Sequence, residues 1–343
     1  MINAAIVGMG WWGQTLVESV SGNSNSNKIR FVAGVARKAT EQLEAFTGEH
    51  GLAFVHDYEE ILADPKIDAV VLATPHSVHA DQVVAAAAAG KHVFCEKPFA
   101  LRKASAERAV AATEKAGVTL GLGYNRRLHP EMTKLREQIG SGELGEILHC
   151  EANMTFPNAL YLSPDAWRAS RDETPCGGLT PMGVHAVDGM IDLCGEIDEV
   201  YCQSFRRAVA VDADDTTSML FRMKAGMSGY LATMTATGGG FSFQVFGSKG
   251  FVRLEGMTHI AGAPSEERRK RCFGTCYFKP VKGALQSWEA DQVDIVQAVL
   301  ERFADAVNGT QPFLISTREM IHGAAVTETI VKSAASHQIE KVV

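Results

Sequence analysis

The sequence predicts an α/β protein with two domains: a doubly wound parallel sheet first, then an α+β domain with a large, mainly antiparallel open sheet. Three observations predict this fold. Over the first third of the 343 residues, short apolar runs alternate with helix-like segments, which is typical of βαβ units. A glycine-rich turn follows the first apolar run. After about Arg127 the pattern changes to successive strand-like runs joined by short loops, which favours an antiparallel sheet.

We place a dinucleotide-binding domain at residues 1–125 and a substrate-binding and oligomerisation domain at 126–343, with a C-terminal helix able to pack back on the first domain. The first domain is expected to hold strands at 2–7, 29–35, 53–55, 69–73, 93–95 and 118–124, and helices at 14–20, 40–50, 59–63, 79–89 and 103–116. The second is expected to hold strands at 147–156, 200–205, 216–223, 228–235, 241–246 and 251–254, and helices at 183–194, 288–307 and 317–336.

Composition excludes several classes of protein. The net charge of −7 argues against a nucleic-acid-binding surface, and no apolar run approaches the ~18 residues of a membrane span. The chain starts directly on a strand pattern, so we expect no signal peptide. Its seven cysteines are scattered without a C-x-x-C pair, which predicts free thiols in a reducing cytoplasm and no metal site. We expect a small-molecule substrate, no nucleic acid and no membrane partner.

The turn Gly8-Met9-Gly10-Trp11-Trp12-Gly13 lies between a strand and a helix. Gly8 allows the tight turn, Gly10 lets a pyrophosphate approach the backbone, and Gly13 lets the helix pack closely on the sheet. The N–H groups at the helix start face the phosphates. A glycine-rich turn without a ligand is the alternative, but the strand–turn–helix context favours a dinucleotide.

The turn after the second strand indicates which dinucleotide is preferred. NAD-binding domains place an acid there for the ribose 2′-hydroxyl. Here Ala36 is followed by Arg37 and Lys38, which suits a 2′-phosphate and favours NADP over NAD. In the alternative interpretation, both cations are solvated surface charges and NAD is the cofactor.

Two further turns are predicted to lie at the same sheet edge. Thr74-Pro75 follows a buried strand, and Thr74 is a candidate for a ribose or phosphate contact, a helix cap, or both. Cys95-Glu96-Lys97-Pro98 ends the next strand. Lys97 can donate to a substrate oxygen or lower the pKa of a hydroxyl, and Glu96 can orient a neighbour. A surface ion pair is the alternative for Glu96 and Lys97.

One helix in the second domain has a narrow polar arc. At ~100° per residue His185, Asp188 and Asp192 share one face, while the rest of the helix is apolar. A buried polar arc faces a cavity or another polar group. His185 is therefore either a proton-transfer group or a core histidine that Asp188 or a backbone carbonyl satisfies.

Together these segments resemble the glucose–fructose oxidoreductase / inositol dehydrogenase / MocA (Gfo/Idh/MocA) family along essentially the whole chain. The resemblance rests on the glycine turn, Thr74-Pro75 with His79, Glu96-Lys97-Pro98, and Gly183-Val184-His185 with Asp188. It implies an NAD(P)-dependent dehydrogenase or reductase acting on CH–OH groups. It also implies a homodimer or homotetramer formed through the C-terminal sheet.

The resemblance and the turns above give our expected site residues. Lys97 and His185 are expected to be catalytic. Cofactor contacts are expected from Gly8, Gly10, Trp11, Trp12, Gly13, Ala36, Arg37, Lys38, Thr74, Pro75, His79, Glu96, Lys97, Asn125, Trp167 and Arg168. Substrate contacts are expected from Lys97, Tyr124, Asn158, Tyr161, His185 and Asp188.

One position departs from the family pattern. Many sugar and inositol members carry an aspartate four residues before the histidine, where this chain has Pro181. The leading expectation remains hydride transfer to or from a secondary alcohol or ketone carbon of a sugar, polyol or cyclic diol. The alternatives are a lyase or glycoside hydrolase that uses its nucleotide transiently, and a non-catalytic NADP-binding regulator.

Overall fold

The structure is a computed structural model that describes residues 1–22, 26–257, 264–270 and 272–343. The chain divides into two compact units. Unit 1 comprises Met1–Asn125 with Asp294–Ile321, and unit 2 comprises Arg126–Val293 with His322–Val343. Residues 21–27, which the sequence predicts to form a polar loop, lie partly outside the described residues. No helix in the described part of the chain has the length and apolar character needed to cross a bilayer.

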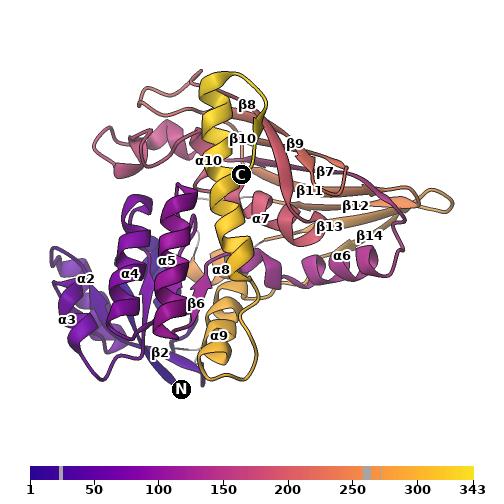
Figure 1. Ribbon diagram of the computed structural model, residues 1–343. Coiled ribbons are helices and arrows are strands. Elements are labelled where there is room, and N and C mark those ends of the chain that lie inside the picture. The colour runs from indigo at the N-terminus through magenta and orange to yellow at the C-terminus, as the bar shows by residue number, and fades with distance from the viewer. Residues whose placement is uncertain (23–25, 258–263, 271) are drawn as a thin grey trace. The chain divides into compact units, whose positions relative to one another are not determined.

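Unit 1 is built on a six-stranded parallel sheet in the order β3-β2-β1-β4-β5-β6. Its central strands are buried along nearly their whole length, because helices cover both faces of the sheet. Figure 1 shows α4 and α5 packed side by side. The strands are β1 Ile2–Val7, β2 Ile29–Val35, β3 Ala53–Val55, β4 Ala69–Leu72, β5 His92–Cys95 and β6 Leu120–Leu122. The helices up to Asn125 are α1 Trp11–Ser19, α2 Glu41–His50, α3 Tyr58–Ala63, α4 His79–Ala88 and α5 Lys103–Ala116.

A late segment of the chain completes unit 1. Helix α9 (Ile295–Val307) packs on α1, β2 and β5. Its Phe303 ring lies 5.7 Å from the Phe94 ring, and Asp305 pairs with Lys28 at 2.8 Å. The expected domain limits therefore need correction, because 126–343 is not one continuous second domain. The expected helix at 288–307 was also too long, since Trp288 lies in a strand and the helix begins only after Asp294 caps it.

Unit 2 is built on a nine-stranded, mainly antiparallel sheet in the order β14-β13-β12-β11-β7-β10-β9-β8-β15. The expected hairpins β9–β10 and β11–β12 are both present. Strand β7 enters between β10 and β11 and pairs with β10 in parallel. The strands are β7 Ile147–Thr155, β8 Ile197–Phe205, β9 Thr216–Met223, β10 Ser228–Met234, β11 Gly240–Gly247, β12 Gly250–Gly256, β13 Thr275–Pro280, β14 Gln286–Glu289 and β15 Glu340–Lys341.

Helix α7 (Gly183–Cys194) covers one face of this sheet, where it packs on β7 and β10 and its Gly189 faces Phe243 of β11. Helix α6 (Pro130–Gly140) packs beside α7, and the short α8 spans Ser265–Lys270. The final helix α10 (Thr317–Ser336) starts in unit 1 and continues in unit 2. The two-part fold class expected from the sequence is confirmed.

A buried carboxylate organises a loop of unit 2. The side chain of Asp215 accepts hydrogen bonds from the backbone N–H groups of Arg207, Ala208 and Val209, at 2.8, 2.6 and 3.1 Å. Burial opposes ionisation of Asp215, but these bonds outweigh it and hold its pKa below the usual value. The loop then packs in an apolar cluster with the segment that carries the expected Trp167 and Arg168. The cluster comprises Ala159, Ala169, Val209, Val211 and Ala213.

Candidate active site

Backbone hydrogen bonds align the turns at the carboxyl edge of the parallel sheet in unit 1. Gly8 donates to Val35, Ala73 to Val7, Glu96 to Leu72, and Gly123 to Cys95. Each bond joins the end of one strand to the end of its neighbour. The glycine turn, the Thr74 turn, the Lys97 turn and the segment after β6 therefore meet at one edge, which is where open α/β sheets bind ligands.

The glycine turn has the geometry that a pyrophosphate site needs. Gly8 has a φ of +95°, and a Cβ there would lie 2.6 Å from the Ala73 carbonyl oxygen. A Cβ on Gly13 would collide with the Gly8 carbonyl oxygen, whereas Gly10 faces open space. Gly10 caps α1 without a side-chain bond, and the first turn of α1 contains no acid. The backbone N–H groups of this helix start can therefore receive an anion.

Aromatic and cationic side chains flank this turn. Trp11 is exposed and lies edge-on to Trp12, with 5.4 Å between the ring centroids. After β2, Ala36 is half-buried while Arg37 and Lys38 are exposed. Neither cation has a hydrogen bond or ion pair to any residue that the structure describes. Both are therefore available for a phosphate.

Glu96 is 5% exposed, so its carboxylate is buried. It faces Gly123, where a Cβ would lie 2.6 Å from the Glu96 Oε1 atom, and the backbone N–H of Lys97 donates to its Oε2 atom at 3.2 Å. Burial raises the pKa of Glu96, against the opposing effects of the Lys97 charge and the Trp12 indole. Lys97 is half-buried and is joined to Pro98 by a cis peptide bond.

His79 connects two turns of this edge. Its Nδ1 atom lies 2.9 Å from the Pro98 carbonyl oxygen and its Nε2 atom lies 3.0 Å from the Thr74 carbonyl oxygen. The residue is 0% exposed, and its expected cofactor contact stays a prediction. His79 holds the Thr74 and Lys97 turns together. The Thr74 hydroxyl donates to Gln82 of α4 and caps no helix; Pro75 is the cap residue of the 3-10 turn His76–Val78, and Val78 is that of α4.

The polar arc of α7 is present in unit 2, and its two acids face arginines. Asp188 accepts from Arg127 Nε at 2.9 Å and from Nη2 at 2.7 Å, and both side chains are nearly inaccessible. Asp192 bridges Arg127 and Arg136. Arg127 donates to both carboxylate oxygens of Asp188, and the expected substrate contact of Asp188 stays a prediction. His185 lies one turn before Asp188 and is 9% exposed.

The remaining expected residues differ in accessibility. Tyr124 and Asn125, just after β6, are each 7% exposed. In unit 2, Asn158 and Tyr161 are exposed on a short 3-10 turn, and the Arg168 guanidinium lies over the Trp167 ring at 4.1 Å. Burial lowers the pKa of Arg168. These positions stay predictions, as do the cofactor contacts above.

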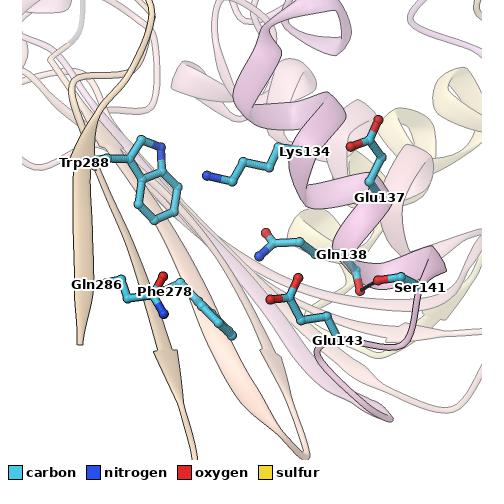
Figure 2. Close-up of a pocket in the computed structure, with 8 residues that line it drawn as sticks. All are labelled: Lys134, Glu137, Gln138, Ser141, Glu143, Phe278, Gln286 and Trp288. Atoms are coloured by element: carbon cyan, nitrogen blue, oxygen red, sulfur yellow. Dashed lines mark hydrogen bonds between the residues drawn. The ribbon is translucent and has the colours of Figure 1, made fainter. Parts of the chain in front are cut away.

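Two pockets elsewhere contain none of the expected site residues. In unit 2 a groove of about 360 Å³ lies between α6 and strands β13 and β14 (Figure 2). Lys134 points from α6 towards the Trp288 ring there, 3.7 Å from its centroid. In unit 1 a pocket of about 490 Å³ opens near the amino ends of the strands, beside Met1, Asp68 and Lys91.

Family models match both parts of the chain. Residues 2–124 match the model of an oxidoreductase family with an NAD-binding Rossmann fold, and residues 132–253 match the GFO/IDH/MocA C-terminal domain. The chain belongs to the Gfo/Idh/MocA family. The family expected from the glycine turn and Glu96-Lys97-Pro98 is thereby confirmed, and so is the expected enzyme class, that of NAD(P)-dependent oxidoreductases.

Several relatives are named as enzymes of sugars and polyols. The chain is 30% identical to the myo-inositol 2-dehydrogenase of Thermotoga maritima over 65% of its own length and 66% of that enzyme. It is 26% identical to the 1,5-anhydro-D-fructose reductase of Ensifer adhaerens over 91% of each chain. The structure of levoglucosan dehydrogenase with NADH superposes with a TM-score of 0.84, covering 100% and 99% of the chains at 20% identity, which shows the shared fold.

We expect Glu96→Gln to remove a loss of folding stability that depends on pH. Because the folded-state pKa of Glu96 is raised, ionised Glu96 costs stability, and the wild type loses stability as pH rises through that pKa. The variant should be at least as stable as the wild type at pH 8, and its advantage should vanish below about pH 4. Thermal unfolding across this range, with exposed Glu107→Gln as control, measures the difference. A wild type that is the more stable protein at pH 8 would contradict this.

Proposed function

We propose that this protein is an NADP-preferring dehydrogenase or reductase. Its substrate is a sugar, polyol or cyclic diol, and the reacting carbon is a secondary alcohol or ketone. The observation that carries the proposal is the common strand edge of unit 1, where the open glycine turn after β1 and Lys97 after β5 lie at strand ends that only β4 separates. The names of the inositol, anhydrofructose and levoglucosan enzymes support this substrate class.

The cofactor residues fit a phosphorylated dinucleotide. The open space at Gly10 and the uncapped start of α1 suit the pyrophosphate. Exposed Arg37 and Lys38 suit a 2′-phosphate, and no acid competes in that turn. Bound there, the nicotinamide nucleotide supplies or accepts the hydride.

The chain supplies the proton chemistry and the orientation. The Lys97 ammonium donates to the substrate oxygen and favours its negative charge, which lowers the pKa of a reacting hydroxyl. His185 takes up or returns the proton, since an imidazole titrates near neutral pH. Glu96 and His79 hold the Lys97 turn in place by the contacts described above. The Arg127–Asp188 pair fixes α7, which carries His185.

The competing activities have less support. A lyase or glycoside hydrolase that uses its nucleotide transiently would show no net change in nicotinamide absorbance. A non-catalytic regulator would not need Lys97 beside a buried carboxylate. The relatives reported above are named as dehydrogenases and a reductase, which favours net oxidation or reduction.

Replacing Lys97 tests the proposed chemistry. In a screen of polyols, sugars and cyclic dihydrodiols with NADP and NAD in parallel, we expect Lys97→Met to lower kcat about 10²–10⁴-fold. NADPH binding, measured by fluorescence titration, should be retained, because the glycine turn is unchanged. Lys115→Met on the exposed side of α5 is the matched control. Full activity of Lys97→Met would rule out the assigned role.

Replacing the two cations after β2 tests the cofactor preference. Arg37→Ala combined with Lys38→Ala should reduce the ratio of kcat/KM for NADP over NAD on the order of 10–100-fold, because charge-assisted bonds to the 2′-phosphate are lost. Lys66→Ala combined with Lys115→Ala removes the same charge elsewhere and should leave the ratio unchanged. A wild type that uses NAD and not NADP would contradict the preference.

We also propose a homodimer or homotetramer in which the outer face of the unit 2 sheet contacts a second copy. A continuous row of paired positions crosses this face: Tyr201, Leu220, Tyr230, Glu151, Gln244, Arg253 and Tyr277. Leu220 is 54% exposed and the three tyrosines are half-buried. Partly exposed apolar side chains on an open sheet face are typical of association surfaces.

Sedimentation velocity tests this surface. The wild type should sediment as a dimer or tetramer, and Leu220→Lys should shift it towards the monomer, because a charge would be buried in the contact. Leu285→Lys, at an exposed loop position away from the row, is the control. A monomeric wild type would overturn the proposal.

All seven cysteines are buried free thiols, from which we infer a reducing compartment such as the cytoplasm.

A further inference from the structure

Arg126, the first residue of unit 2, carries a charge that the described chain does not balance. Its Nη1 atom is buried and has no hydrogen-bond partner, and the guanidinium makes no ion pair within the described ranges. The guanidinium carbon lies 4.4 Å from the centroid of the Phe241 ring. This cation–π contact stabilises the stem and one face of the guanidinium but neutralises nothing.

The aromatic rings and the thiol near Arg126 carry no charge. Phe241 and Phe273 pack together with 5.3 Å between their ring centroids, and His129 lies edge-on to Phe273 at 4.7 Å. Burial, followed by the charge of Arg126, lowers the pKa of His129 to about 4, so the imidazole is neutral at physiological pH. Burial raises the pKa of the Cys272 thiol, which is therefore also uncharged. Asp291 acts on His129, where its charge opposes the lowering of the pKa, but within the described ranges Asp291 makes no ion pair with Arg126.

The adjacent arginine shows the contrast. Arg127 lies in the same 3-10 turn, and Asp188 holds it in a bidentate pair that Asp192 extends. Arg127 is thus buried together with its counter-charge, as a structural arginine must be. A guanidinium buried without one is costly, because its hydration is lost and nothing replaces it. An external anion bound to such a group would supply the missing charge.

The place of Arg126 in the chain indicates which anion. It is bonded to Asn125, the last residue of unit 1, shortly after β6 reaches the carboxyl edge of the parallel sheet. We propose that Arg126 is a specificity-determining residue that binds a carboxylate of the substrate. The preferred substrates are then acidic sugars or polyols, such as uronates and aldonates, or carboxylated cyclic diols. A planar guanidinium with free N–H groups matches a carboxylate in two parallel hydrogen bonds. This inference rests on the proposed function.

Matched substrates that differ only in the carboxylate test the inference. With NADP present, kcat/KM should be about 10–100-fold higher for D-glucuronate than for D-glucose, and likewise for D-galacturonate over D-galactose. Arg126→Met keeps the length of the side chain over Phe241 and removes the charge. It should bring both ratios close to one, mainly by raising KM for the acidic sugar. Arg126→Lys, which keeps the charge but not the fork of donors, should retain part of the preference.

A binding measurement separates recognition from turnover. D-Glucuronate should raise the thermal unfolding midpoint of the NADP-loaded wild type but not that of NADP-loaded Arg126→Met. Circular dichroism checks that the variant is folded. Arg108→Met removes the same charge from an exposed pair with Asp81, and it should leave both the ratios and the thermal shift unchanged.

Three results would overturn the inference. The first is a wild type with no preference for the acidic sugars. The second is a preference that survives in Arg126→Met. The third is a variant that loses NADP affinity equally with every sugar, which would assign the anion to a nucleotide phosphate. Failure of the proposed function gives a different result: no turnover of any alcohol or ketone with either nucleotide, while D-glucuronate still binds.

Discussion

The parallel hydrogen-bond ladder of unit 1 is the constraint on which the candidate site depends. Parallel strands linked by helices all point their carboxyl ends to the same edge, and the bonds from Gly8, Ala73, Glu96 and Gly123 to neighbouring strand ends set the level of each turn. Turns that are far apart in the sequence therefore lie side by side at one edge of the sheet. Local constraints, such as the steric conflict that forbids a side chain at Gly13, arise only because this ladder places the conflicting groups next to each other.

Buried polar groups then fix the turns that the ladder brings together. His79 joins the Thr74 and Pro98 carbonyl groups, and Glu96 occupies the space that the missing side chain of Gly123 leaves. In unit 2 the same principle fixes α7 through Arg127 and Asp188. In each case a buried polar group bonds to partners from another element. Because leaving such a group buried without partners costs free energy, other arrangements of these elements are disfavoured. Arg126 differs from these groups, because no ion pair among the described residues balances its charge, and this difference is the basis of the proposed substrate contact.

Much of this arrangement could be predicted from local pattern. The apolar periodicity predicted α7 and β9 at their observed limits, and the glycine turn predicted the strand–turn–helix unit. Prediction failed where the tertiary contacts of a segment favoured a different structure from the one that its apolar periodicity indicates. Trp288 follows a helical pattern but lies in edge strand β14, where its indole donates to Glu131 of α6. Strand β7 inserts between β10 and β11, and no hairpin signal predicts a partner from so far along the chain.

The sequence by itself determined the two-part fold class, the dinucleotide turn and the family. These depend on residue spacing, which is a local property and can be read from the sequence without knowing the tertiary contacts. Only the tertiary structure decided how the polar residues are used: that His79 is a buried link, that Asp188 pairs with Arg127, and that Arg126 has no counter-charge among the described residues. It also decided that α9 completes unit 1. The physical reason is that burial and charge pairing are properties of residues distant in sequence. The glycine turn therefore predicted the cofactor class, whereas the structure supplied the argument for the substrate.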